Sequence, residues 1–473
     1  MLFNSQVFLV FITLFLPLFF LSRGQTRLLI SLGASYVFYG WWDWRFLGLI
    51  WFSTLLNFFL GSTIFRTKPD TRKKLITLAV VINLGFLGFF KYFNFFIDTA
   101  NQLLNAIGMG AGLGMLEIIL PVGISFYTFQ TMSYTLDIYR GKITPEPSLL
   151  RFATFVAFFP QLVAGPIVRA EIFIPQLYRN NTFQWNRFIG GLGLVLVGYF
   201  KKVGVADTLA ILVDRVYDSP GAFSPTMVII ACVFYSFQIY CDFSGYSDIA
   251  IGLARIMGYD FPENFRSPYF SRNFSEFWTR WHISLSSWLR DYLYIPLGGN
   301  RRGALRTGVN LMLTMLLGGL WHGANWTFVV WGGLHGIYLI VQRLIQPLGR
   351  QLPDRGIVSS VMNLSSIVFV FLLTTFTWIF FRSQSISEAF VILERIAMFR
   401  GFSGSDLLFM FPLTKGCLLI FLVLIIDLTM TRVNILAWLP LRPYTALVLF
   451  VGLILTMAFL GTFDSQQFIY FQF

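Results

Sequence analysis

The sequence predicts an all-α protein that crosses a membrane many times, and three observations predict it. Hydrophobic residues make up 56% of the 473 residues and charged residues only 12%, which is too little charge to cover a water-soluble body of this size. Aromatic residues reach 18%, as suits lipid-facing phenylalanine and interfacial tryptophan and tyrosine. Apolar runs of membrane-spanning length recur along the chain. We therefore expect a helical bundle, because helices satisfy their own backbone hydrogen bonds inside a bilayer.

The apolar segments predict roughly ten to twelve transmembrane helices, with re-entrant and interfacial amphipathic helices between them. Glycine and proline interrupt the stretch from Pro160 to Pro166, which is typical of re-entrant or tilted helices that line a cavity. We expect one membrane-embedded domain over residues 1–473, in which residues 463–473 form a short tail. The segments lie near residues 7–22, 28–42, 46–65, 75–97, 118–137, 188–200, 226–252, 308–321, 325–342, 358–381, 413–430 and 444–462.

Basic residues set the expected orientation, because loops rich in Lys and Arg stay in the cytoplasm. The formal net charge is +13, from 35 Lys and Arg against 22 Asp and Glu. Arg23 and Arg27 follow the first segment, whereas residues 98–117 carry no basic residue. These positions predict that both termini, including the tail, are extracytoplasmic. No basic module stands apart from the apolar segments, so we expect membrane lipid and no nucleic acid as a partner.

Residues 274–292 have the pattern of one interfacial amphipathic helix. Apolar side chains recur at steps of three and four from Phe274 to Tyr292, with charged residues elsewhere around the helix. The surrounding segment, residues 255–306, is rich in arginine, which indicates a cytoplasmic face. His282 lies beside the apolar face of this predicted helix.

The chain has only three histidines, His282, His322 and His335, and all lie within or beside apolar sequence. Ionisable residues are costly at membrane depth, so they usually face a protein interior or an aqueous cavity and serve function. His322 follows Arg306 by about sixteen residues, roughly 24 Å of helix. We therefore expect His322 well inside the bilayer and His282 at a different depth.

A neutral imidazole at His322 could take a proton from a hydroxyl group. Glycines around it leave room for a substrate, and we expect Trp321 and Asn325 to line the pocket. The alternative is a buried histidine that hydrogen-bonds a neighbouring helix. For an isolated histidine this alternative is the commoner case, and we keep it for His335.

Two aspartates, Asp242 and Asp248, occupy another apolar stretch, where they either line a polar funnel of the substrate pocket or form hydrogen bonds between helices. No metal site is expected, because the histidines lack His-x-x-x-His spacing and the cysteines form no Cys-x-x-Cys pair. The sequence also has no Gly-x-Ser-x-Gly motif and no phosphate-binding loop.

The motifs of this chain resemble those of the membrane-bound O-acyltransferase superfamily, in particular the bacterial branch that O-acetylates polysaccharides such as alginate or cellulose. An exporter of D-alanyl groups for teichoic acids is a nearby relative. The resemblance runs through the whole chain, at Met1 to Ser5, Tyr36 to Trp44, Phe158 to Gln161, Ala164 to Pro166, Cys241 to Ile249, Phe277 to Gly299 and Trp321 to Ala324.

This resemblance implies a membrane-bound O-acetyltransferase of the bacterial inner membrane. It would carry acetyl groups from cytoplasmic acetyl-CoA to an extracytoplasmic polysaccharide, together with periplasmic acetyltransferase partner proteins and without a permanently bound cofactor. The family pairs two histidines, which implies His322 as the catalytic base and His282 as its companion. Arginines of the basic segment would bind the CoA phosphates, although they could equally hold lipid headgroups. They are Arg280, Arg290, Arg301 and Arg302.

The aromatic tail adds a third candidate catalytic residue. Related systems end in a similar motif that contains tyrosine, which implies that the Tyr470 phenol carries the acetyl group as an ester. A phenolate leaves more readily than a sugar alkoxide, so such an ester would pass its acetyl group on. The alternative is an aromatic anchor at the membrane surface.

Two other functions stay open on the sequence. A transporter or lipid flippase would use His322 and the two aspartates as a proton relay and would consume no thioester. A related acyl exporter would take a D-alanyl or other acyl group from an acidic carrier protein, which would dock on the arginine-rich segment.

Overall fold

The structure, a computed structural model, describes residues 1–110, 112–345, 357–399, 401–402, 404–432, 438–463 and 468–469. Of the described residues, 80% are helical, and none of them lies in a strand. Nine helical stretches among these residues are long and apolar enough to cross a membrane, and the apolar helix α1 (Gln6–Leu21) is shorter. The predicted all-α polytopic membrane protein is therefore confirmed.

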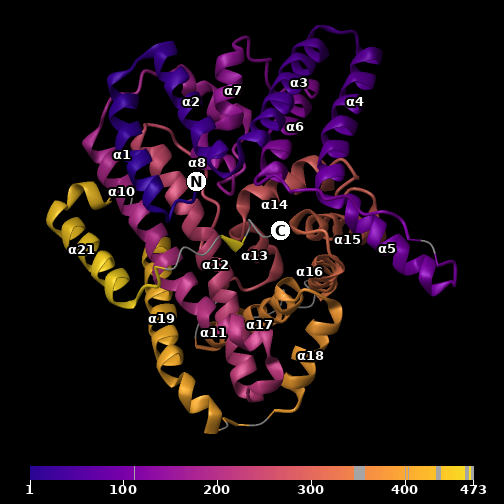
Figure 1. The fold of residues 1–473 in the computed structure, drawn as a ribbon, viewed down its shortest axis with the longest axis vertical. Coiled ribbons are helices and arrows are strands. Elements are labelled where there is room, and N and C mark those ends of the chain that lie inside the picture. The colour runs from indigo at the N-terminus through magenta and orange to yellow at the C-terminus, as the bar shows by residue number, and fades with distance from the viewer. Residues whose placement is uncertain are drawn as a thin grey trace. The chain divides into compact units, whose positions relative to one another are not determined.

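The helices fall into two compact units, and Figure 1 labels most of the helices of both. The first unit comprises residues 1–192 and 250–262, and the second comprises residues 193–249 and 263–473. Two long helices, α10 (Trp185–Tyr199) and α12 (Pro225–Ile256), have residues in both units. The single domain expected over residues 1–473 stays a prediction.

The remaining elements keep the order of the predicted apolar segments. The first unit contains α1, α2 (Gly24–Asp43), α3 (Leu47–Arg66), α4 (Pro69–Leu87), α5 (Phe93–Ala106), α6 (Ile124–Tyr139), α7 (Leu149–Ala157), α8 (Phe159–Leu162) and α9 (Ala170–Phe173). The second contains the π-helical η4 (Phe200–Ala206), α11 (Asp207–Asp218), α13 (Phe274–Arg280), α14 (Ile283–Leu289), the π-helical η7 (Arg290–Tyr294), α15 (Gly303–His322), α16 (Trp326–Ile345), α17 (Ile357–Arg382), α18 (Ile386–Ala397), α19 (Met410–Arg432) and α21 (Pro443–Leu460).

The interrupted stretch from Pro160 to Pro166 leaves helical geometry inside the first unit. The chain ends α8 at Leu162, and residues 163–168 are buried without being helical. Polar side chains bond to the backbone where the helix is broken: the Phe155 carbonyl accepts hydrogen bonds from the Gln130 and Gln161 amides, at 2.9 and 2.7 Å. Irregular backbone at membrane depth is stable only when protein surrounds and satisfies it in this way.

Glycines set the close approach of α10 and α12. A Cβ atom on Gly198 would lie 2.6 Å from the Gly245 carbonyl oxygen, and one on Gly245 would lie 2.7 Å from the Gly198 carbonyl oxygen. A second pair repeats the arrangement, because a Cβ on Gly191 would lie 2.6 Å from the Gly252 carbonyl oxygen. The two pairs lie about two helical turns apart. The glycine that comes first on α10, Gly191, contacts the one that comes second on α12, Gly252. The helices are therefore antiparallel, with their backbones in contact.

The prediction of one continuous amphipathic helix over residues 274–292 is wrong. The segment forms two short helices, α13 and α14, and Trp281 and His282 make the corner between them. Apolar side chains on both sides of the corner, including Phe277 and Leu285, are buried within the second unit. The apolar pattern correctly predicted the buried side chains of this segment, but it could not show that the chain turns inward at His282.

Glycines also join α15 and α16, which lie side by side (Figure 1). A Cβ atom on Gly319 would strike the Phe328 carbonyl oxygen, and one on Gly332 would strike the Met315 carbonyl oxygen. No side chain fits at either position unless a helix backbone moves. Since His322 is the last residue of α15, this tight packing also fixes the position of His322 relative to α16.

Gly332→Ala should destabilise the packed α15–α16 pair, whereas Gly333→Ala should not. Overpacking against backbone atoms typically costs about 1–3 kcal/mol. The Cβ of an alanine at position 333 would make an ordinary contact with Leu316 Cδ2 at 3.5 Å, and alanine favours a helix over glycine by roughly 1 kcal/mol. Thermal unfolding in detergent measures the difference. Equal melting temperatures for the two variants would show that the helices can separate without cost.

Candidate active site

The structure brings His282 and His322 together in the second unit. His322 ends α15 and His282 occupies the corner before α14, and their ring centroids are 6.3 Å apart. The expectation that they lie at different depths is therefore wrong. It assumed one helix for residues 274–292, whereas the corner carries His282 into the interior, where its exposed fraction is 0%.

Aromatic side chains surround both imidazoles. Trp321, predicted to line the pocket, is buried with its ring centroid 5.0 Å from that of His322 and 5.9 Å from that of His282. The Phe243 ring centroid lies 4.6 Å from that of His282. The Trp331 and Phe381 ring centroids lie 5.1 and 5.4 Å from that of His322. Such surroundings disfavour the charged imidazolium, so they favour neutral rings that can accept a proton.

The backbone at His282 is strained. His282 has φ 42° and ψ 55°, the left-handed conformation that usually requires glycine, and it shares positive φ with Ser267 alone among the described non-glycine residues. For a residue with a Cβ atom this conformation costs roughly 1–2 kcal/mol. Strain of this kind persists only where the surrounding structure enforces it, and it concentrates at functional sites.

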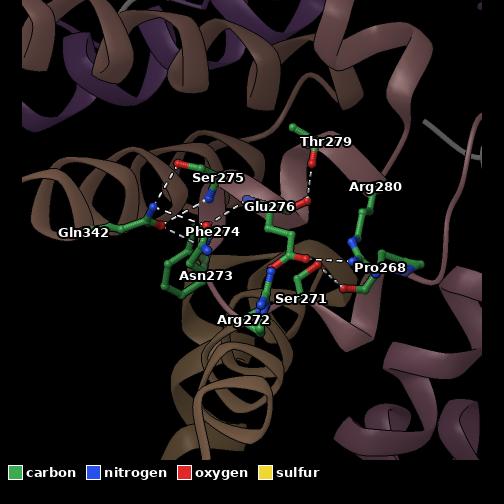
Figure 2. Close-up of polar contacts among 10 residues, drawn as sticks. All are labelled: Pro268, Ser271, Arg272, Asn273, Phe274, Ser275, Glu276, Thr279, Arg280 and Gln342. Atoms are coloured by element: carbon green, nitrogen blue, oxygen red, sulfur yellow. Dashed lines mark hydrogen bonds and ion pairs between the residues drawn. The ribbon is translucent and has the colours of Figure 1, made fainter. Parts of the chain in front are cut away.

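A polar network holds α13, the helix that leads into His282, as Figure 2 shows. The Asn273 side chain caps the helix at the Glu276 N–H, at 2.9 Å. From α16, Gln342 accepts hydrogen bonds from the Phe274 and Ser275 backbone N–H groups, at 2.8 and 3.2 Å. The two helices are thereby tied together at the start of α13.

Arg280, one of the four predicted CoA ligands, belongs to this network (Figure 2). It bonds Glu276 at 2.7 Å, and Arg272 bonds the other oxygen of the same carboxylate at 3.2 Å. Burial raises the pKa of Glu276, but the hydrogen bonds from Arg272 and the charges of Arg280 and Arg272 outweigh burial and hold this pKa below its usual range. Arg280 is therefore already occupied by a charged partner.

The other three predicted CoA ligands are exposed. Arg290 pairs with its neighbour Asp291 at 2.8 Å. Arg301 and Arg302 lie just before α15 and make no ion pair with any residue that the structure describes. Of the four arginines, these two leave their charge available for an anionic ligand.

Asp242 and Asp248 both bond lysines of the π-helical turn η4. Lys202 lies 2.7 Å from Asp242 and 2.8 Å from Asp207, and Lys201 lies 2.8 Å from Asp248. From α19, Asp427 lies 4.0 Å from Lys201 and accepts a hydrogen bond from Tyr240 at 2.7 Å. These contacts link different helices. We call Lys201, Lys202, Asp207, Asp242, Asp248 and Asp427 the buried charge cluster.

Sequence reasoning missed four members of the buried charge cluster: Lys201, Lys202, Asp207 and Asp427. The signal was present, since Lys201 and Lys202 directly follow the apolar segment at 188–200 and Asp427 lies within that at 413–430. Charged residues in such positions need partners. Which partners they take depends on the glycine contact between α10 and α12, which the sequence did not reveal.

Part of the C-terminal tail docks on the buried charge cluster. The Ile469 N–H donates a hydrogen bond to Asp242 at 2.8 Å, and the Lys202 ammonium lies 4.4 Å from the centroid of the Phe468 ring. Phe468 also packs edge-on against Tyr246 and is only 1% exposed. Tyr470, the predicted acyl carrier, lies outside the described residues.

Asn325 and His335 have local structural partners. The Asn325 side chain caps α16 at the Thr327 N–H, at 3.0 Å, and donates to the Gln384 carbonyl at 2.7 Å. His335 Nε2 lies 3.1 Å from Thr377 Oγ1 on α17. His335 thus has the interhelical hydrogen bond expected of a buried structural histidine.

Comparisons with known proteins give the chain a family. The model of the membrane-bound O-acyltransferase family matches residues 37–383. A probable alginate O-acetylase of Pseudomonas aeruginosa is 43% identical over 412 residues, which cover 86% of this chain and 77% of that protein. A peptidoglycan O-acetyltransferase of Helicobacter pylori is 36% identical, over 78% of this chain and 73% of that protein. A teichoic acid D-alanyltransferase of Streptococcus thermophilus is 31% identical over 46% of this chain and 56% of that protein.

Asp242→Ala should release the docked tail, whereas Asp248→Ala should leave it in place. Both substitutions break a buried lysine pair, which typically costs about 3–5 kcal/mol, but only Asp242 also holds the Ile469 N–H. Chymotrypsin cleaves after phenylalanine, so cleavage at the buried Phe468 reports release, and exposed Phe463 provides an internal reference. Mass spectrometry would follow both sites. Equally slow cleavage at Phe468 in both variants would contradict the docking.

Proposed function

The chain belongs to the membrane-bound O-acyltransferase family, and we propose that it moves acetyl groups from acetyl-CoA to an extracytoplasmic polysaccharide. The observation that carries this proposal is the pair of buried histidines whose rings lie 6.3 Å apart among aromatic side chains. The family assignment makes the chain an acyltransferase, and the pair offers the proton-transfer groups that acyl transfer to a hydroxyl needs.

In the proposed reaction, His322 acts as the general base. Its neutral imidazole accepts the proton of an acceptor hydroxyl while the hydroxyl oxygen attacks the thioester carbonyl carbon. A C–O bond forms, the C–S bond breaks, and the CoA thiolate leaves with the proton that His322 returns to it. His282 lies close enough to contact the same reacting group and to orient it. The surrounding aromatic rings keep water away from the thioester.

Arg301 and Arg302 are the best-supported ligands for the CoA phosphates. Both are exposed, and their charges are not engaged by ion pairs within the described residues. Arg280 and Arg290 would have to exchange Glu276 and Asp291 for phosphate. On this proposal, the arginines take acetyl-CoA from the cytoplasm, and no cofactor stays bound between turnovers.

The names of the relatives support a polymer outside the cytoplasm as the acceptor. Several relatives are named as probable alginate O-acetylases, and one is named a peptidoglycan O-acetyltransferase. We extend this to a polysaccharide of the alginate or cellulose type and to periplasmic acetyltransferase partner proteins. The proposal places the chain in the bacterial inner membrane with both termini in the periplasm.

His322→Ala should strongly slow acetyl-CoA turnover by purified protein in nanodiscs, measured as free thiol with polymer and partner proteins present. Loss of a general base typically slows a reaction by about 10²–10⁴-fold. His335→Ala is the matched control, because it removes a buried histidine that bonds Thr377 and should reduce stability more than rate.

Two results of this assay would redirect the proposal. Thioester consumption only from a D-alanyl carrier protein would identify the activity named for the teichoic acid relatives. No thioester loss from any donor, with all partners added, would refute acyl transfer by this chain.

Tyr470→Phe should block acetylation of the polymer if Tyr470 carries the acetyl group in transit. The substitution keeps the aromatic ring and removes the phenol oxygen that would form the ester. Mass spectrometry of the C-terminal peptide should detect an acetyl group on Tyr470 in the wild type and none in His322→Ala. Full polymer acetylation by Tyr470→Phe would eliminate the carrier role and leave the tail as an anchor.

A further inference from the structure

The corner at His282 is bracketed by the segment that follows α12. The Arg266 N–H donates to the Arg280 carbonyl at 2.9 Å, and the Ile283 N–H donates to the Asn264 carbonyl at 2.9 Å. These two bonds join the chain on either side of His282 to one short stretch of backbone. They limit how far the corner can open.

The Asn264 side chain completes this bracket. Its Oδ1 accepts hydrogen bonds from the Ser284 N–H at 3.2 Å and from the Ser284 hydroxyl at 2.8 Å. Its Nδ2 donates to the Ser247 hydroxyl on α12 at 3.0 Å. Asn264 is 1% exposed, so these bonds are shielded from bulk solvent. One amide therefore ties the first turn of α14 to α12.

This arrangement matters for His282 because the turn is strained. Ile283 and Ser284, whose N–H groups bond Asn264, directly follow His282, whose φ is 42°. The Ile283 bond is made to the Asn264 backbone carbonyl, whereas the Ser284 bonds are made to its side chain. Without the side-chain bonds, His282 could relax toward an ordinary helical or extended conformation and redirect its ring. A ring displaced by about 1 Å from its productive position can lower a rate by roughly 10²-fold.

We propose that Asn264 is a positioning residue that holds the His282 imidazole facing His322 for acyl transfer. The proposal deepens the function proposed above and rests on it. Asn264 does not touch the reacting groups; it acts through the backbone that follows His282. Through Ser247 it also fixes this turn relative to α12, the helix that carries Asp242 and Asp248.

Asn264→Ala should lower kcat for acetyl-CoA consumption by about 10–100-fold and leave KM for acetyl-CoA nearly unchanged, because chemistry and not donor binding depends on the pose of His282. Ser284→Ala removes one hydrogen bond of the bracket and should give a smaller loss of the same kind. It also keeps the test available if Asn264→Ala does not fold.

A second readout does not depend on activity. Diethyl pyrocarbonate modifies accessible imidazoles, and mass spectrometry gives the rate for each histidine. In Asn264→Ala, modification of His282 should accelerate severalfold while that of His335, buried on α16, stays at its wild-type rate. Asn83→Ala is the matched control. Asn83 and its partner Asn57, 3.1 Å away, are both buried in the first unit, so this substitution should not change the modification rate of His282.

The outcomes separate this proposal from the proposed function. A folded Asn264→Ala protein with wild-type kcat, or one in which His282 and His335 become reactive together, would overturn the positioning role. If the wild type consumes no acetyl-CoA at all, the proposed function fails, while selective modification of His282 would still establish that Asn264 holds the turn.

Discussion

The cost of burying charge in an apolar environment governs the architecture of the second unit. Lys201 and Lys202 are almost inaccessible, and their burial is tolerable only because each has a carboxylate within 2.8 Å, one for Lys201 and two for Lys202. Those carboxylates come from α11 and α12, with Asp427 of α19 nearby. The requirement for partners therefore gathers helices that are distant along the chain, and the glycine contact between α10 and α12 lets their backbones come close enough.

The histidine pair occupies the opposite kind of environment. Aromatic rings from α12, α15, α16 and α17 enclose the two imidazoles. The charge of Asp242, which directly precedes Phe243, is paired with Lys202. The second unit thus separates a charged region from an apolar region on the same helix, since Phe243 of the apolar region directly follows Asp242. Neutral imidazoles in apolar surroundings suit proton transfer to and from a hydroxyl or thiol.

Several parts of the fold were predictable because they depend on local sequence. Some apolar segments match observed helices, as at 226–252 for α12, whereas the segment 75–97 covers the end of α4 and the start of α5. The prediction of His322 as a catalytic residue followed from its apolar setting and from motifs that resemble those of a family. The corner at His282 was not predictable from periodicity. The apolar residues of α13 and α14 each recur at helical spacing, and only Trp281 and His282 lie between the two helices.

Amino-acid order alone was enough to predict a bundle of apolar helices, three histidines in or beside apolar sequence, and a resemblance to one family. Each of these follows from composition, spacing or motif. The three-dimensional fold was needed to show that His282 meets His322, that Lys202 pairs with Asp242, and that Phe468 is buried beside Lys202. The physical reason is that these contacts join residues remote in sequence, and close packing of glycine-bearing helices selects them over others that the same residue types would allow.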